Sequence, residues 1–153
     1  MSKEPRTLVG RPLIGGSAEG LALVSGQPLS FWGGYCPKTG EIIDRRHERS
    51  GAIAAGRVLV FPTGKGSSTS SAILLESIRA GTAPAAVINL KTDPILALGA
   101  IVADELYGRS VPMVILSEND FFSICEGDLI AIEPDGTVTV RGSQGRRCDA
   151  RGS

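Results

Sequence analysis

The chain has 153 residues, of which 42% are hydrophobic, and its 16 Lys and Arg residues balance 16 Asp and Glu residues. This length and apolar content fit one domain with a buried core, expected over residues 1–142, followed by a polar tail at 143–153. A balanced charge argues against nucleic-acid binding. No apolar run is long enough to span a membrane, and the first residues lack the apolar core of a signal peptide, which favours a cytoplasmic protein.

The first third of the chain predicts strands followed by an irregular segment. The stretches TLVGRPLIGG and EGLALVS, beginning at Thr7 and Glu19, are typical of strands interrupted by glycine. Residues 26–51 have no clear periodicity. Irregular segments of that length are often binding loops.

The middle of the chain alternates extended and helical patterns. We expect strands at 57–63, 85–90 and 111–117, and helices at 68–79 and 94–106. Such alternation predicts an α/β fold in which helical crossovers join parallel strands. The second helix has clear boundaries, with Thr92 or Asp93 as its N-terminal cap, Pro94 in its first turn and Gly108 after its end.

Residues 127–142 carry the strongest hairpin signal in the sequence. A Pro134-Asp135-Gly136 turn separates two stretches in which apolar and polar residues alternate. This pattern predicts two antiparallel strands joined by a tight turn.

The turn between the strand at 57–63 and the first helix, Gly64 to Ser71, reads GKGSSTSS. Serine and threonine at a helix start often only cap the helix, because their oxygens accept hydrogen bonds from its first N–H groups. The alternative is an active-site turn, in which the helix N-terminus and Lys65 favour an anionic ligand. The residues do not form a phosphate-binding P-loop, because Gly66 rather than Ser or Thr follows Lys65.

Other chemistries have little support in the sequence. No Gly-x-Ser-x-Gly nucleophile elbow is present, and His47 is the only histidine. The three cysteines, Cys36, Cys125 and Cys148, are far apart in sequence. We therefore expect no metal site built by this chain alone.

The motif GKGSSTSSAILLE, preceded by LVFPT and by PLSFWGGYCPKTGEIIDRRHERSG further upstream, resembles the small-subunit, or swivelling-domain, part of the aconitase X family. The resemblance covers about residues 7–141 and implies an α/β fold of the swivelling β/β/α type. Aconitases carry a related Gly-x-Gly-Ser-Ser turn on their mobile domain, in which the first serine acts as the base. The resemblance assigns that role to Ser67.

The family resemblance also implies the reaction and the partner. Its members dehydrate small hydroxy acids, and elimination of water needs a base at one carbon and an acid at the departing hydroxyl. A serine can act as the base where its alkoxide is stabilised, which Lys65, Ser68 and the helix N–H groups would do. The resemblance implies that an iron–sulfur cluster lies on a larger catalytic subunit, and that this domain closes over it.

Further residues are expected to bind substrate. In the turn and the helix start they are Gly64, Lys65, Gly66, Ser68, Thr69 and Ser70, and upstream they are Phe31, Trp32, Gly33 and Gly34. The upstream four have an equal alternative as a packed loop. Asp44, Arg45 and His47 are candidates for partner or substrate contacts, although a solvated charged loop is the commoner explanation. Cys36 could lie near the partner's cluster, and a free thiol is the simpler interpretation.

Several substrates and functions remain open. The motif is more similar to bacterial small subunits that convert cis-3-hydroxy-L-proline to 1-pyrroline-2-carboxylate than to archaeal subunits that act on phosphomevalonate. A phosphocarrier swivelling domain would need a histidine at the turn, where Ser70 or Ser71 stands. A non-catalytic binding subunit, whose serines only cap the helix, is the last alternative.

Overall fold

The computed structural model describes residues 5–64, 69–109 and 111–142. Its strands form one sheet with the order β1-β8-β7-β3-β4-β5-β6-β2. Their bounds are β1 (Arg6–Val9), β2 (Arg11–Ile14), β3 (Ala18–Val24), β4 (Val58–Val60), β5 (Ala86–Asn89), β6 (Met113–Ile115), β7 (Leu129–Ile132) and β8 (Thr137–Arg141). Strands β3 to β6 pair in parallel, and the remaining pairs are antiparallel. The predicted α/β architecture with parallel central strands is confirmed.

The helices begin and end close to the predicted residues. They are α1 (Thr69–Ala80), α2 (Pro94–Tyr107) and a short α3 (Glu118–Phe122) that was not predicted. The Asp93 side chain caps α2 by accepting a hydrogen bond from the Leu96 N–H, at 3.1 Å, and Gly108 ends the helix with φ of 65°. The predicted hairpin is also present, since β7 and β8 pair across a turn in which Gly136 has φ of 93°.

Gly10 lies where the first segment of the chain closes the sheet into a near-barrel. Before it, β1 pairs with β8, and after it, β2 pairs with β6 at the opposite end of the strand order. A Cβ atom on Gly10 would lie 2.2 Å from Val114 Cγ1 and 2.8 Å from the Gly136 oxygen. Only glycine therefore lets the chain pass this crossing without displacing its neighbours.

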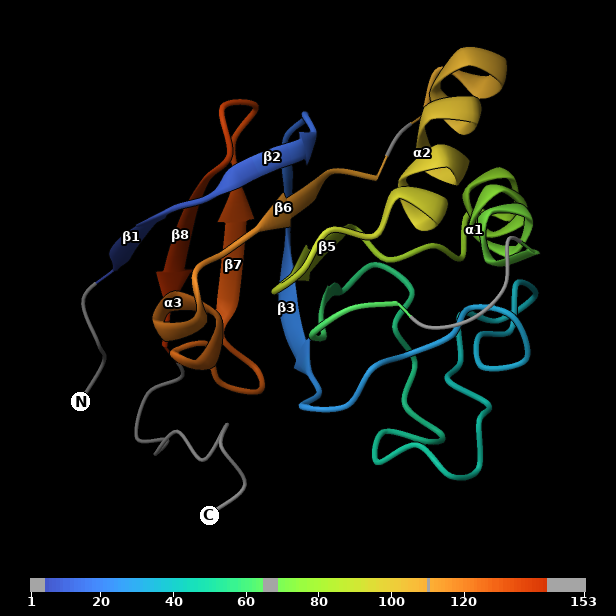
Figure 1. Ribbon diagram of the computed structural model, residues 1–153, viewed down its shortest axis with the longest axis horizontal. Coiled ribbons are helices and arrows are strands. Elements are labelled where there is room, and N and C mark those ends of the chain that lie inside the picture. The colour runs from blue at the N-terminus through green and yellow to red at the C-terminus, as the bar shows by residue number, and fades with distance from the viewer. Residues whose placement is uncertain (1–4, 65–68, 110, 143–153) are drawn as a thin grey trace.

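The sheet separates two apolar clusters, because successive side chains of a strand point to opposite faces. One face packs against α1, α2 and the irregular segment between β3 and β4, and its cluster includes Leu23, Leu59, Val87, Leu74 and Leu96. The other face packs inside the near-barrel with the hairpin and α3, and its cluster includes Val58, Val60, Ile88, Phe121 and Val138. Figure 1 shows the two helices together on one side and the hairpin with α3 on the other.

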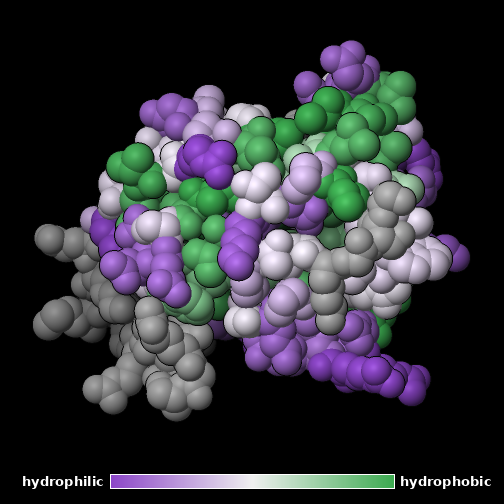
Figure 2. Space-filling model, in the orientation of Figure 1, coloured by the Kyte–Doolittle hydropathy of each residue, from purple (hydrophilic) through white to green (hydrophobic). Residues whose placement is uncertain are grey.

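Helices α1 and α2 pack closely at Gly99, where a Cβ atom would lie 2.4 Å from the Ser71 oxygen. The outer face of α2 is apolar and exposed, as the hydrophobic surface over this helix in Figure 2 shows. Leu98 is 53% exposed and Leu106 63% exposed. None of the helices in the described ranges is long and apolar enough to cross a membrane.

Candidate functional site

Gly64 and α1 flank the predicted active-site turn. Gly64 forms an isolated parallel bridge with Leu29, so the chain that follows β4 lies beside the start of the irregular segment. A Cβ atom on Gly64 would lie only 1.7 Å from Asp93 Oδ2. The position therefore needs glycine because the carboxylate that caps α2 occupies the space of a side chain. Gly64, the first residue of the turn, is thus packed against the N-terminal cap of α2.

The central residues of the turn, Lys65, Gly66, Ser67 and Ser68, lie outside the described residues. Thr69 is the first residue of α1 and is exposed. Ser70 is 7% exposed, and its Oγ accepts a hydrogen bond from the Trp32 N–H at 3.3 Å. This bond joins the two segments of the expected substrate-binding set, since it connects the start of α1 to residues 31–34.

The four upstream residues divide between the core and the surface. The Phe31 ring is 1% exposed and stacks on Tyr35 with centroids 4.5 Å apart, so it anchors the loop. Trp32 is 56% exposed. Gly33 has φ of 78°, and a Cβ atom on Gly34 would lie 2.2 Å from the Ser30 oxygen, so both positions favour glycine for backbone reasons. Because Phe31 is buried and the two glycines have no side chain, Trp32 is the residue of the four whose side chain can shield a ligand.

Glu126 connects the irregular segment to the sheet. One carboxylate oxygen accepts the Val24 N–H at 2.8 Å and pairs with Arg49, and the other accepts from Arg57 Nη2 at 2.8 Å. Burial raises the pKa of Glu126, but the hydrogen bonds from Val24 and Arg57 and the charge of Arg49 outweigh burial and lower it. Arg57 also donates to the Ala22 oxygen at 2.8 Å. The loop is thus fixed to β3 and to the start of β4 by charged groups.

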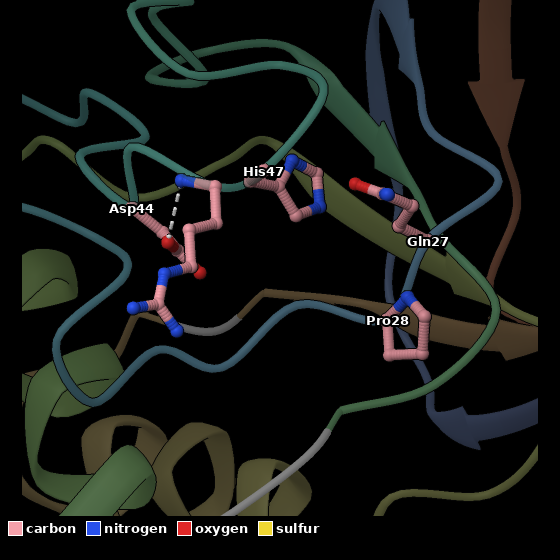
Figure 3. Close-up of a pocket in the computed structure, with 5 residues that line it drawn as sticks. Gln27, Pro28, Asp44 and His47 are labelled. Atoms are coloured by element: carbon pink, nitrogen blue, oxygen red, sulfur yellow. Dashed lines mark hydrogen bonds between the residues drawn. The ribbon is translucent and has the colours of Figure 1, made fainter.

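A polar hollow of about 400 Å³ opens at the base of this loop (Figure 3). It is lined by Gln27, Pro28, Asp44, Arg46 and His47. The lining includes two of the predicted candidates, Asp44 and His47, but Arg46 in place of Arg45. One wall of the hollow is connected to the residue that precedes the turn, because Pro28 is followed by Leu29, whose N–H donates to the Thr63 oxygen at 3.3 Å.

His47 is 6% exposed and is held within a network rather than in a solvated loop. Its Nδ1 accepts the Arg49 N–H at 3.0 Å, which in the neutral ring leaves the proton on Nε2, 3.4 Å from Ser25 Oγ. Ser25 Oγ donates to Glu48 Oε2 at 2.8 Å. Burial raises the pKa of Glu48, but the hydrogen bonds from Ser25 and Gly26 outweigh burial and lower it.

The sequence did not reveal Gln27, Pro28 or Arg46 as lining residues. They lie in two segments without periodicity, and only the fold brings residues 27–28 and 44–47 together. Pro28 and the charged run around Arg46 were only weak signals that these residues line a binding loop.

Cys36 is a free thiol whose pKa is lowered, chiefly by a hydrogen bond from the Thr39 side chain. In the described ranges, no three His, Cys, Asp or Glu side chains gather as a metal site.

Comparisons with known proteins show which protein family this chain resembles. A family model described as the aconitase X swivel domain matches residues 7–140. The chain is 51% identical, over 116 residues, to a cis-3-hydroxy-L-proline dehydratase of Pseudomonas aeruginosa, covering 76% of this chain and 20% of that protein. It is 39% identical, over 142 residues, to the phosphomevalonate dehydratase small subunit of Methanosarcina acetivorans, covering 92% of this chain and 89% of that subunit.

The chain thus spans about a fifth of the hydroxyproline dehydratases it matches, 20% and 22% of their lengths. Among solved structures it is similar to Thermococcus kodakaraensis aconitase X in its holo form, with a TM-score of 0.79, 35% identity, and 88% of this chain and 98% of that chain covered. It is also similar to a protein named UPF0107, solved in solution by NMR, with a TM-score of 0.76, 38% identity, and 87% and 97% covered. The predicted fold type is confirmed, and the chain belongs to the aconitase X swivel-domain family.

Proposed function

We propose that this chain is the small subunit of an aconitase X-type dehydratase and that Ser67 is its catalytic base. The observation that carries the proposal is the family match over residues 7–140, which contains the whole Gly64 to Ser71 turn. The relatives' names support a dehydratase. The bond between Ser70 and Trp32 supports a site at this turn, because it holds an exposed aromatic side chain beside the helix start.

The partner in this proposal is a larger subunit. Relatives named small subunits are matched over about nine-tenths of their length, whereas the hydroxyproline dehydratases are about five times longer than the matched part. In this proposal the rest of the longer chains corresponds to a separate, cytoplasmic large subunit that holds an iron–sulfur cluster. When bound, such a cluster supplies a Lewis acid for the departing hydroxyl.

The residues of this chain would carry the proton-transfer half of the reaction. Ser67 removes the proton at the carbon next to the hydroxyl-bearing carbon. Lys65, Ser68 and the first N–H groups of α1 stabilise the alkoxide form of Ser67. The domain then excludes water by closing, with Trp32 beside the site.

The proposed substrate is cis-3-hydroxy-L-proline, supported by 51% identity to a dehydratase of that name. Phosphomevalonate is the second candidate, because a small subunit of that name is 39% identical and is matched over 89% of its length. Purified complex of this chain with its large subunit should release water from the first compound. Release only from phosphomevalonate would select the second candidate.

Ser67→Ala tests the base directly. In the reconstituted complex this change should lower kcat by at least about 100-fold, the lower range for losing a positioned proton-transfer group. The melting temperature of the isolated chain should change little. A cap would behave in the opposite way, with a loss of about 0.5–2 kcal/mol in stability and nearly normal turnover. Near-normal kcat in Ser67→Ala would remove this residue from the mechanism and leave a non-catalytic subunit.

A further inference from the structure

The polar hollow beside the turn has one carboxylate and one guanidinium among its lining groups. Figure 3 shows Asp44 and His47 on one segment and Gln27 and Pro28 on another, with the Gln27 side chain extending toward the His47 ring. The volume of about 400 Å³ lies within the range of small-ligand sites, about 300–1,000 Å³. The hollow therefore has the size and the mixed charge of a site for a small polar molecule.

Two of the lining side chains, Asp44 and Gln27, are held in place by hydrogen bonds. Each still has polar atoms that can bind a ligand. Asp44 Oδ1 accepts the Arg46 N–H at 3.0 Å, which fixes the carboxylate. Gln27 Oε1 accepts the Glu48 N–H at 2.8 Å, so the amide NH₂ group remains as a donor. Within the described part of the chain, the Arg46 guanidinium has no ion pair and Asp44 Oδ2 has no hydrogen bond. The Asp44 carboxylate and the Gln27 amide are therefore preorganised and bind a ligand with little ordering cost, whereas the exposed Arg46 side chain must be ordered when a ligand binds.

The negative charge of Asp44 and the positive charge of Arg46 line the same hollow. A ligand that carries one group of each sign is therefore favoured. A zwitterion matches them, with its carboxylate on Arg46 and the Gln27 amide and its ammonium on Asp44. A phosphorylated hydroxy acid carries a phosphate of about −1.5 to −2 beside its carboxylate and has no cation to offer Asp44. Unpaired like charges discriminate against such a ligand.

We infer that the Asp44–Arg46 hollow is the subsite that holds the ammonium and carboxylate of an amino-acid substrate, and so selects zwitterionic hydroxy acids over phosphorylated ones. This inference rests on the proposed dehydratase function and gives it a substrate class. In this assignment the reacting part of the substrate lies on the side of Pro28, the residue before Leu29, which pairs with Gly64. Asp44 and Arg46 are binding residues in this assignment.

The test measures binding without turnover. The probes are L-proline, which has no hydroxyl to lose, and oxolane-2-carboxylate, in which a ring oxygen replaces the ring NH. Calorimetric titration of the purified complex should show that Asp44→Asn weakens L-proline binding by at least about 10-fold, because a hydrogen bond to a charged group is lost. Binding of oxolane-2-carboxylate should stay within about 2-fold, since it has no ammonium for Asp44 to hold.

Two further variants complete the design. Asn at position 44 keeps an oxygen for the Arg46 N–H, so the loop turn is preserved. Arg46→Gln should weaken both probes by at least about 10-fold, because both carry the carboxylate. Glu105→Gln is the matched control, because it removes an exposed carboxylate near the C-terminal end of α2 and should change neither affinity.

The outcomes separate this inference from the proposed function. Equal weakening of both probes by Asp44→Asn, no weakening of either, or no L-proline binding by the unaltered complex would overturn the subsite. If that happens while cis-3-hydroxy-L-proline is still dehydrated, the proposed function stands alone. Asp44-dependent L-proline binding in a complex that dehydrates nothing would instead retain the subsite and refute the dehydratase.

Discussion

Two regions of the molecule border the candidate site: the pair of helices α1 and α2, and the irregular loop at residues 26–56. They are stabilised in different ways. Helices α1 and α2 pack against the sheet with apolar side chains, and Leu74 and Leu96 are almost fully buried. Residues 26–56 instead form isolated bridges, bends and turns. Polar side chains tie them to the sheet, since Arg49 pairs with Glu126, which binds the Val24 N–H, and Glu48 binds Ser25, directly after β3. The helix pair depends on apolar volume, whereas the loop combines buried apolar side chains, among them Phe31 and Ile42, with ties made by charged groups.

This difference suits the proposed roles of the two regions. Apolar packing is insensitive to pH and tolerates exposed substitutions, so it can present the turn at a constant position. A loop held by hydrogen bonds to charged groups keeps polar atoms at its surface, where a ligand can meet them. The following changes separate the two kinds of stabilisation, beginning with the largest expected effect.

Removing apolar volume from the helix pair should have the largest effect. Leu74 is 0% exposed in the cluster below α1, so Leu74→Ala should lower the free energy of unfolding by about 2–5 kcal/mol. Arg79→Ala on the same helix removes an exposed ion pair with Glu76, which solvent screens, and should leave the stability nearly unchanged. Urea denaturation followed by circular dichroism measures both. Equal losses would show that α1 is not held by its apolar face.

Glu126→Gln should loosen the loop by about 1 kcal/mol, the upper end for partly exposed ion pairs. The pKa of folded Glu126 lies below its ordinary value of 4.5, so the folded state binds fewer protons than the unfolded state. Its contribution is therefore present above about pH 4.5 and is lost as the pH falls through the lowered pKa. Melting temperatures measured from pH 7 down to pH 3 should show a smaller acid-side decrease in Glu126→Gln than in the unaltered chain.

Ser70→Ala should have a smaller effect on stability, about 0.5 kcal/mol, because the hydrogen bond that it removes is long at 3.3 Å. Its consequence should be local, since Trp32 loses its link to α1. Hydrogen exchange of the Trp32 amide should become faster while amides in β4 and β5 keep their protection. Unchanged exchange at Trp32 would show that the bond to Ser70 does not hold this part of the loop.

The smallest effect is spectroscopic. Trp32 is the only tryptophan of the chain and is 56% exposed, so its fluorescence reports on the surface beside the turn alone. Addition of the large subunit should shift its emission to shorter wavelength, because a closing partner removes water from the ring. The Trp32→Phe chain in the same titration corrects for the partner's own fluorescence. An unshifted spectrum in a complex that forms by size-exclusion chromatography would place Trp32 outside the closed site.

The helices and the hairpin could be predicted because their signals are local. Periodicity located α1 and α2, and the cap at Asp93 and the turn at Gly136 marked boundaries to within a residue or two. The closure of the sheet at Gly10 could not be predicted, because the residue pattern of a strand does not indicate which other strand it pairs with. The same limit applies to the hollow, where Arg46 and Gln27 meet only through tertiary contacts. The role of Ser67 comes from the family resemblance and stays a prediction.

The closure of the sheet at Gly10 has a consequence for how the protein is made. Among the described strands of this domain, β1 is synthesised first, and its partner β8 is synthesised last. Until residue 141 has been synthesised, the apolar interior between β3 to β6 and the hairpin lacks its cover. Pairing of chain ends is slow because a long loop must close first. The domain therefore exposes an open apolar face until β8 has been made, and a chaperone can bind this face during that interval.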